Sequence, residues 1–311
     1  MRIARAIAAL LLLAVAGAIA FVYVAPEQAT RVVIELERSH AGLSRHEVTL
    51  PSGMHYVFLE GGKGTPLMLL HGFGADKDHF TRVAAFLTQH YRVIVPDHAG
   101  FGESSHFPGA DYHSAAQAER LHELAAILGI RRLHIGGNSM GGQIAMAYAA
   151  RYPEEVLSMW LLDPAGIWSA PKSELAHLVQ EQGRNPLIAR NEEEFAQTFS
   201  FVMSDPPFVP RPILNVLAQG PIHNVPLANH IFEQIATDSL EQRIAGNKVP
   251  ALIVWGSEDR AIHVGTADVL HKLLPNSAVI VMPGVGHLPM VERPKQSATD
   301  YLRFRNSLPT S

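Results

Sequence analysis

Ser139 stands in the middle of the pentad Gly-Asn-Ser-Met-Gly, residues 137–141. An apolar run ends at this pentad and a helical pattern begins inside it, so the sequence predicts a sharp turn from a strand into a helix. Glycines on both sides leave room for the turn, because side chains there would collide with the neighbouring backbone. The turn would hold the serine hydroxyl above the edge of a sheet, beside the positive end of a helix. Ser139 is therefore the predicted nucleophile of an acyl-transfer reaction.

A serine hydroxyl attacks a carbonyl only when a base takes its proton, and the base needs an acid to orient it. His287 lies just after the last apolar run of the chain, and Asp259 lies just after the run before it. The order Ser139, Asp259, His287 is the one expected when each residue follows its own strand of a parallel sheet, and it predicts a catalytic triad. Two other acids are alternatives to Asp259, namely Glu258 beside it and Asp163 at the end of an earlier apolar run.

The negative charge that forms on the carbonyl oxygen needs two backbone N–H donors. One is predicted at Met140, directly after the nucleophile. The other is predicted at Phe73, within the glycine-containing segment 71–74 that follows an early apolar run. This chemistry requires no metal and no organic cofactor, and we predict neither.

Apolar runs of strand length alternate with helical patterns along most of the chain. The predicted strands are a hairpin, 46–50 and 54–60, followed by six buried runs at 66–70, 91–97, 132–137, 156–163, 251–256 and 278–284. The predicted helices lie at 79–89, 114–128, 140–151, 263–274 and 293–306. This alternation predicts an α/β fold with a mostly parallel, doubly wound sheet. The stretch 166–248 contains no convincing strand, and we interpret it as a mostly helical insertion.

The first apolar stretch, 6–25, carries no charge and is long enough as a helix to cross the hydrocarbon core of a bilayer. Arg2 and Arg5 precede it, which favours an N-terminus in the cytoplasm and the remainder of the chain on the other side. The alternative is a cleaved signal peptide, with Ala-Ile-Ala at 18–20 as its cleavage site. We favour an uncleaved transmembrane anchor, because the apolar run continues past that site and is longer than a signal core.

Residues 26–43 are predicted as an amphipathic juxtamembrane helix that begins at Pro26 and stops at Gly42. Its apolar stripe packs on its own domain, or contacts lipid or a second subunit, and the sequence leaves these alternatives open. Small residues in the anchor would permit close packing between helices, so a homodimer through both helices is a further hypothesis. These small residues are Ala14, Gly17 and Ala18.

Composition excludes several classes of function. The 311 residues include 25 Lys and Arg against 29 Asp and Glu, for a net charge of -4. A nucleic-acid partner is therefore not expected, since such proteins carry a basic excess. The chain has no cysteine, which excludes disulfides, thiol nucleophiles and cysteine-bound metals.

Five motifs together resemble the α/β-hydrolase superfamily over residues 45–308. They are HGFG (71–74), DHAGFGESS (97–105), GNSMGG (137–142), GSEDR (256–260) and GVGHLPMVERP (284–294). The resemblance implies that Asp97 and the glycines after it shape a loop and do no chemistry. It also implies that the insertion is a cap over the site. The predicted regions are then an anchor (1–25), a juxtamembrane helix (26–43), an α/β-hydrolase core (44–165 and 249–311) and a helical cap (166–248).

With its anchor and juxtamembrane helix, the chain resembles bacterial single-span, membrane-anchored lipases and phospholipases A. This implies a serine acyl-ester hydrolase in the cytoplasmic (inner) membrane, with its catalytic domain on the periplasmic side and membrane phospholipids as substrates. The cap supplies apolar residues suited to acyl chains. They are Trp168, Leu187, Ile188, Phe201, Val202, Met203, Phe208, Ile213, Leu214 and Leu217.

Two other functions remain open on this fold, because fold alone does not fix function. One is carbon–carbon bond hydrolysis, whose enzymes typically have tryptophan after the catalytic histidine, where this chain has Leu288. The other is a non-enzymatic ligand receptor. Dehalogenases and epoxide hydrolases of the superfamily use an aspartate nucleophile, and Ser139 argues against both.

Overall fold

The computed structural model describes residues 2–308, and eight strands in it form one sheet. The strands are β1 (Leu43–Thr49), β2 (His55–Gly61), β3 (Pro66–Leu70), β4 (Arg92–Pro96), β5 (Leu133–Asn138), β6 (Val156–Leu162), β7 (Ala251–Gly256) and β8 (Ser277–Met282). Their order is β1-β2-β4-β3-β5-β6-β7-β8, antiparallel from β1 to β4 and parallel from there on. All eight predicted strands are confirmed, with ends that shift by at most three residues.

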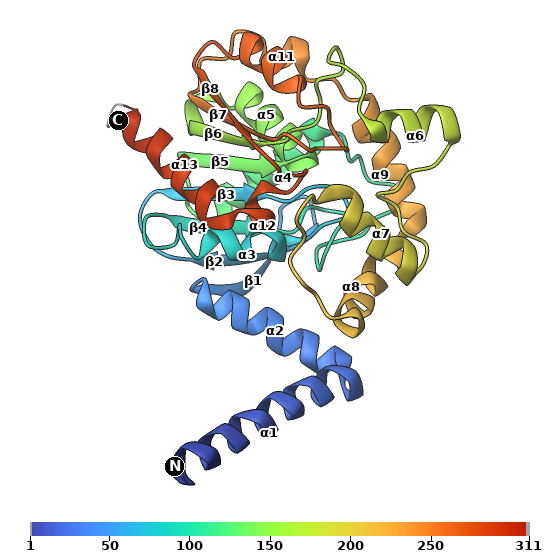
Figure 1. The fold of residues 1–311 in the computed structure, drawn as a ribbon. Helices are drawn as coiled ribbons and strands as arrows, with labels where there is room; N and C mark the ends of the chain where they lie inside the picture. The colour runs from blue at the N-terminus through green and yellow to red at the C-terminus, as the bar shows by residue number, and fades with distance from the viewer. Residues whose placement is uncertain (1, 309–311) are drawn as a thin grey trace.

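Helices cover both faces of the sheet (Figure 1). One face carries α4 (Ser114–Ile127), α5 (Met140–Arg151) and α11 (Thr266–Leu273), and the other carries α3 (Thr81–Ala84), α12 (Pro289–Glu292) and α13 (Pro294–Ser307). Strand β6 illustrates the two-sided burial, since Met159 and Leu161 join the first core cluster and Trp160 and Leu162 the second. A strand buried on both faces reads as a continuous apolar run, which is why the sequence could identify it.

The helix predicted at 79–89 is shorter than expected. A 3-10 turn spans Lys77–Phe80, α3 spans Thr81–Ala84, and the chain then tightens into turns in which Phe86 and Leu87 donate to carbonyls three residues back. The apolar spacing is satisfied all the same, because Phe80, Val83 and Leu87 are fully buried. Hydrophobic periodicity alone does not distinguish an α-helix from such a run of turns.

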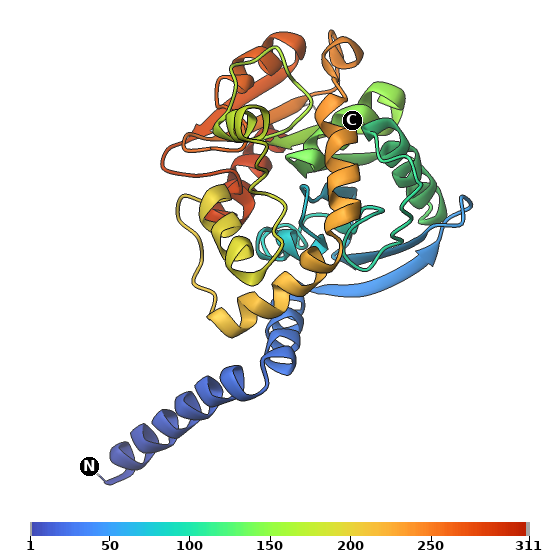
Figure 2. The ribbon, with the colours of Figure 1, turned by 90° about the vertical axis from the view of Figure 1, so that its right-hand side faces the viewer.

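The insertion between β6 and β7 contains five helices, of which the first four lie together at one end of the sheet (Figure 2) and the fifth packs on α5. They are α6 (Glu174–Gln182), α7 (Glu192–Val202), α8 (Arg211–His223), α9 (Val225–Thr237) and α10 (Glu241–Ile244). The side-chain amide of Gln143 on α5 donates to the carbonyl of Ile235 at 3.2 Å and to that of Asp238 at 2.6 Å. These bonds fasten the C-terminal end of α9 to the helix that follows Ser139.

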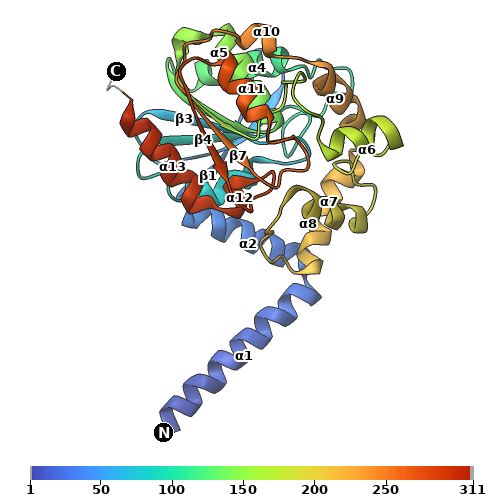
Figure 3. The same ribbon diagram turned by 45° about the horizontal axis from the view of Figure 1, so that its top comes forward.

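Two further helices, α1 (Arg2–Val24) and α2 (Pro26–His40), precede the sheet. Helix α1 projects away from the body of the molecule (Figures 1 and 3), and α2 lies against β1 and the cap helix α8. In the described part of the chain, α1 is the one helix long and apolar enough to cross a membrane. Its span Arg5–Val24 has a mean hydropathy of 2.7 and is not buried. Residue 1 of the predicted anchor and residues 309–311 of the predicted core lie outside the described residues.

Candidate active site

Ser139 occupies the turn between β5 and α5 with a backbone that few non-glycine residues adopt. Its φ is 55° and its ψ is -120°, a conformation that costs about 1–3 kcal/mol and is found mainly at functional sites. Steric contacts explain why residues 137 and 141 of the pentad are glycines. A Cβ at Gly137 would lie 2.3 Å from the backbone of Gly141, and a Cβ at Gly141 would lie 2.1 Å from the carbonyl oxygen of Leu70. The turn is thus built to hold Ser139 where the strand ends.

His287 and Asp259 form a direct hydrogen bond, with 2.8 Å between His287 Nδ1 and Asp259 Oδ2. The Asp259 side chain is fully buried, and that of His287 is 4% exposed. The other carboxylate oxygen of Asp259 accepts the N–H groups of Ala261 at 2.8 Å and Ile262 at 3.0 Å, which fix its orientation. A carboxylate on Nδ1 keeps the proton there, so Nε2 is left as an acceptor for a serine proton.

The turn of Ser139 lies against the loop of His287. The side-chain amide of Asn138 donates to the His287 carbonyl at 2.8 Å and to the Leu162 carbonyl at 3.1 Å. Among the described residues, the Ser139 hydroxyl has no hydrogen bond, to His287 or to any other group. Such bonds are often long in unliganded enzymes and tighten with substrate, so the pairing of Ser139 with His287 stays a prediction.

The predicted oxyanion segment lies beside the nucleophile. A Cβ at Gly72 would stand 3.2 Å from Ser139 Cβ, and the next residue, Phe73, turns its ring toward Phe232 of the cap helix α9 at 5.5 Å. Met140 is the first residue of α5, where the N–H has no acceptor within the helix. In the described chain, neither the Phe73 nor the Met140 N–H is engaged by another residue, so both suit the predicted donor role.

A buried histidine pair shapes the same segment. His71 Nδ1 lies 2.8 Å from the Gly72 carbonyl, and the backbone N–H of His98 donates to His71 Nε2 at 3.0 Å. The ring therefore donates through Nδ1 and accepts through Nε2, which requires the neutral form. Burial lowers the pKa of His71 to about 4, which keeps it neutral at physiological pH.

Of the two alternative acids, Glu258 is exposed and bonds to Ser257 Oγ, away from His287. Asp163 is fully buried, has a φ of 46°, and accepts the Gly256 N–H at 2.8 Å through one oxygen. Its other oxygen has no partner among the described residues. Asp163, Asp259 and His287 bring three polar atoms within 4.8 Å of one another. Burial and the charge of Asp259 raise the pKa of Asp163 well above its ordinary value, which favours its protonated form.

Sequence reasoning missed two residues that hold the site together. Asn138 links the serine turn to the histidine loop, and Glu292 accepts three backbone N–H groups near His287. Both lie inside quoted motifs, but residue type alone does not tell which distant backbone group a side chain reaches.

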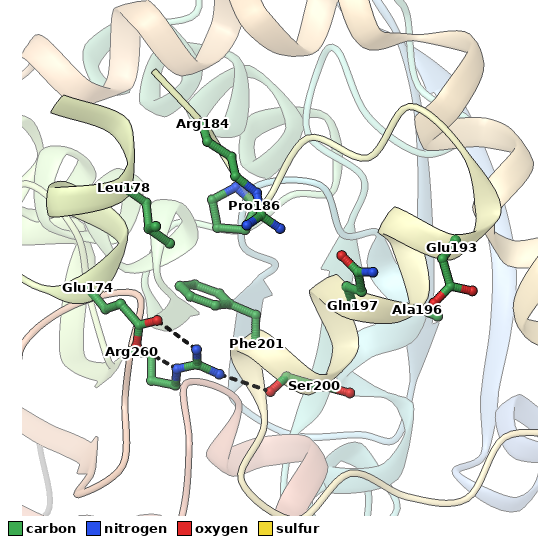
Figure 4. Close-up of a pocket in the computed structure, with 10 residues that line it drawn as sticks. All are labelled: Glu174, Leu178, Arg184, Pro186, Glu193, Ala196, Gln197, Ser200, Phe201 and Arg260. Carbon is green, nitrogen blue, oxygen red and sulfur yellow. Dashed lines mark hydrogen bonds and ion pairs between the residues drawn. The ribbon is translucent and has the colours of Figure 1, made fainter. Parts of the chain in front are cut away.

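A cavity of about 370 Å³ opens between the cap helices α6 and α7 and the residue after Asp259 (Figure 4). Its wall includes Arg260, which bonds to Glu174 at 2.7 Å and covers the Phe201 ring at 4.6 Å. Among the apolar cap residues predicted as an acyl lining, Phe201 borders this cavity, whereas Phe208 is 89% exposed. The residues that line the cavity are Glu174, Leu178, Arg184, Pro186, Glu193, Ala196, Gln197, Ser200, Phe201 and Arg260.

The sequence matches the family model described as the alpha/beta hydrolase fold over residues 65–294. It is 45% identical over 287 residues to Lipase 1 of Psychrobacter immobilis, covering 90% of this chain and 89% of that protein. It is 30% identical to monoacylglycerol lipase ABHD6 of Homo sapiens, covering 81% and 80%. A solved structure described as a membrane phospholipase A and bacterial virulence factor superposes with a TM-score of 0.88 at 41% identity, covering 98% of each chain.

Proposed function

This chain belongs to the α/β-hydrolase family and is a carboxylic ester hydrolase. From that premise we propose that it is a membrane-anchored lipase of the phospholipase A type, working through an acyl-enzyme on Ser139. The observation that carries the proposal is the 2.8 Å bond between His287 and Asp259 beside the strained turn of Ser139. The proposed mechanism needs a nucleophile, a base and an orienting acid, and these three residues supply those groups.

In the proposed cycle, His287 Nε2 takes the Ser139 proton as the serine oxygen attacks the acyl carbonyl. The Phe73 and Met140 N–H groups hold the oxyanion, and Asp259 stabilises the protonated His287. His287 then gives its proton to the departing alcohol, which leaves the acyl group on Ser139. Water, activated by His287, releases the fatty acid and restores the serine.

Two features support a lipid substrate presented by a membrane. Helix α1 is an uncharged apolar span from residue 6 onward in which no residue is buried, and a tether of this kind raises the local concentration of bilayer lipid around the site. A relative at 45% identity is named a lipase, and a structure that matches 98% of this chain is described as a membrane phospholipase A. Arg2 and Arg5 before the span favour an N-terminus in the cytoplasm and a catalytic domain on the periplasmic side, and the likeness to a bacterial membrane phospholipase A favours the cytoplasmic membrane. A homodimer through α1 and α2 stays a prediction.

The test uses the full-length protein in detergent beside a Ser139→Ala variant. Fatty-acid release from phosphatidylglycerol–phosphatidylethanolamine vesicles and hydrolysis of p-nitrophenyl esters of increasing chain length are measured for both. The proposal expects the wild type to release fatty acid and the variant to lose at least about 10³-fold in both assays. Cleavage of soluble esters without release from vesicles would reduce the function to that of an esterase whose anchor serves location.

Carbon–carbon hydrolysis remains the second candidate on this fold. If the wild type cleaves neither lipid nor soluble ester, a vinylogous 1,5-diketone should be tried as substrate, and binding without turnover would favour a receptor. The 45% identity to a protein named a lipase favours ester hydrolysis over both.

A further inference from the structure

Glu292 accepts three backbone hydrogen bonds from two separate parts of the chain. One carboxylate oxygen accepts the N–H of Gly286, the residue before His287, at 2.9 Å. The other accepts the N–H of Ser204 at 2.9 Å and of Asp205 at 2.8 Å, just after the cap helix α7. Glu292 is 8% exposed and lies on the short helix α12 that follows the histidine loop.

The backbones that Glu292 joins are also in direct contact. The N–H of His287 donates to the Val202 carbonyl at 2.7 Å, the shortest backbone bond of the loop. A Cβ on Gly286 would stand 2.7 Å from the Ser204 nitrogen and 2.8 Å from the Val202 oxygen. Cap residues 202–205, which we call the docking segment, therefore pack on the histidine loop with no space for a side chain between them.

A carboxylate suits this position because it accepts several N–H groups at once, and charge-assisted bonds of this kind are stronger than neutral ones. Its removal would leave three N–H groups without an acceptor. The loop and the docking segment would then separate at the point where His287 is oriented toward Ser139. None of these bonds reaches the imidazole ring, so Glu292 acts on catalysis through the backbone that carries it.

We propose that Glu292 is a positioning residue that fastens the histidine loop to the docking segment, so that His287 is in working position only while this part of the cap is docked. This inference rests on the proposed triad. It also implies that residues 202–205 stay fixed during turnover, and that any opening of the cap takes place elsewhere in it.

The first test compares Glu292→Gln and Glu292→Ala with the wild type, as full-length proteins in detergent on p-nitrophenyl butyrate. Glutamine has the same shape but offers a single acceptor oxygen. Either the Gly286 N–H or the N–H groups of Ser204 and Asp205 therefore lose their acceptor. We expect kcat to fall at least about tenfold while KM stays within about threefold, because the defect lies in the reacting groups and not in binding.

The matched control is Glu258→Gln, the same chemical change at an exposed residue beside Asp259, which should leave kcat within about twofold. Assays are run well below the unfolding temperature of each variant, so that a purely structural role would leave kcat of the folded enzyme unchanged. Values of kcat for both Glu292 variants within about twofold of the wild type would overturn the proposal.

A second measurement needs no variant that could fail to fold. Hydrogen exchange of the wild-type protein should show the amides of Ser204, Asp205, Gly286 and His287 exchanging at one common rate, as a single opening unit. Fast exchange at 204–205 with continued protection at 286–287 would overturn the proposal. Failure of the proposed function looks different, because the wild type would then lack ester hydrolysis whatever the exchange rates are.

Discussion

Asp163 and Asp259 face each other from the ends of neighbouring strands β6 and β7, with carboxylate oxygens within 4.8 Å of each other and of His287. Three donors surround Asp259, namely the His287 ring and two backbone N–H groups, whereas Asp163 receives one. Burial and the charge of Asp259 raise the pKa of Asp163 well above its ordinary value. Asp259, which has more donors around it and bonds to the imidazole, is therefore better placed than Asp163 to act as the orienting acid.

The two acids should differ sharply in their effect on rate. Asp259→Asn presents an amide to His287 Nδ1 and favours the wrong tautomer, so we expect kcat to fall about 10³–10⁴-fold. Asp163→Asn keeps an oxygen for the Gly256 N–H and an uncharged group toward Asp259, and should cost less than about tenfold. Hydrolysis of p-nitrophenyl butyrate by folded, purified variants checks this. The reverse order of losses would make Asp163 the catalytic acid.

Stability should depend on pH through Asp163. A carboxyl group whose pKa is raised by folding contributes its full stability below the unfolded value, near 3.8, and loses it as pH rises toward the raised value. Asparagine does not titrate, so Asp163→Asn removes this pH dependence. The unfolding temperature of the variant should therefore rise relative to that of the wild type as pH increases through this window. Thermal unfolding of both proteins across a pH series measures the difference. A difference that does not change with pH would mean that Asp163 is ionised in the fold.

Arg38 connects helix α2 to the 3-10 turn Lys77–Phe80. Its guanidinium donates to both carboxylate oxygens of Asp78, at 2.7 and 2.6 Å, and its side chain is 8% exposed. Arg38→Met removes both arginine hydrogen bonds from a half-buried carboxylate and leaves Lys77, at 4.0 Å, as the cation near it, so we expect a loss of about 1–3 kcal/mol in the free energy of unfolding. Arg38→Lys keeps the charge but not the two-pronged geometry, and should fall in between. Denaturant unfolding checks the order, and a lysine variant as stable as the wild type would contradict it.

Gly137→Ala should destroy the nucleophile turn. The added Cβ would lie 2.3 Å from the Gly141 backbone, a contact that only movement of the turn can relieve. We expect a loss of about 3 kcal/mol or more in stability, together with loss of activity in whatever protein folds. The control is Gly109→Ala, where no heavy atom lies within 4 Å of the new Cβ. Equal unfolding temperatures for the two variants would contradict this account of the turn.

The sequence predicted the features that depend only on residues close together along the chain. The strand, turn and helix around Ser139 are contiguous, and each two-sided strand leaves an apolar run, so both could be identified without coordinates. The order of Asp259 and His287 along the chain predicted their pairing, and their hydrogen bond agrees with it, although their catalytic roles stay predictions. The hydrogen bond from the Ser204 N–H to Glu292 joins residues 88 positions apart, and no sequence spacing predicts it. The raised pKa of Asp163 depends on burial, which a single sequence does not give.

The proposed membrane anchor gives the last prediction. No residue of the apolar span of helix α1 is buried, and its main contacts with the body of the molecule are at α2 and α8. Deleting residues 2–24 should therefore release the protein from membranes and leave hydrolysis of p-nitrophenyl butyrate within about threefold of the full-length value. Hydrolysis of phospholipid vesicles should fall at least about tenfold, because the site then meets lipid by collision and not by tethering. Both rates are compared at equal protein concentration. Unchanged vesicle hydrolysis would mean that the anchor does not deliver substrate, and a parallel loss on the soluble ester would mean that its contact with α8 supports the cap.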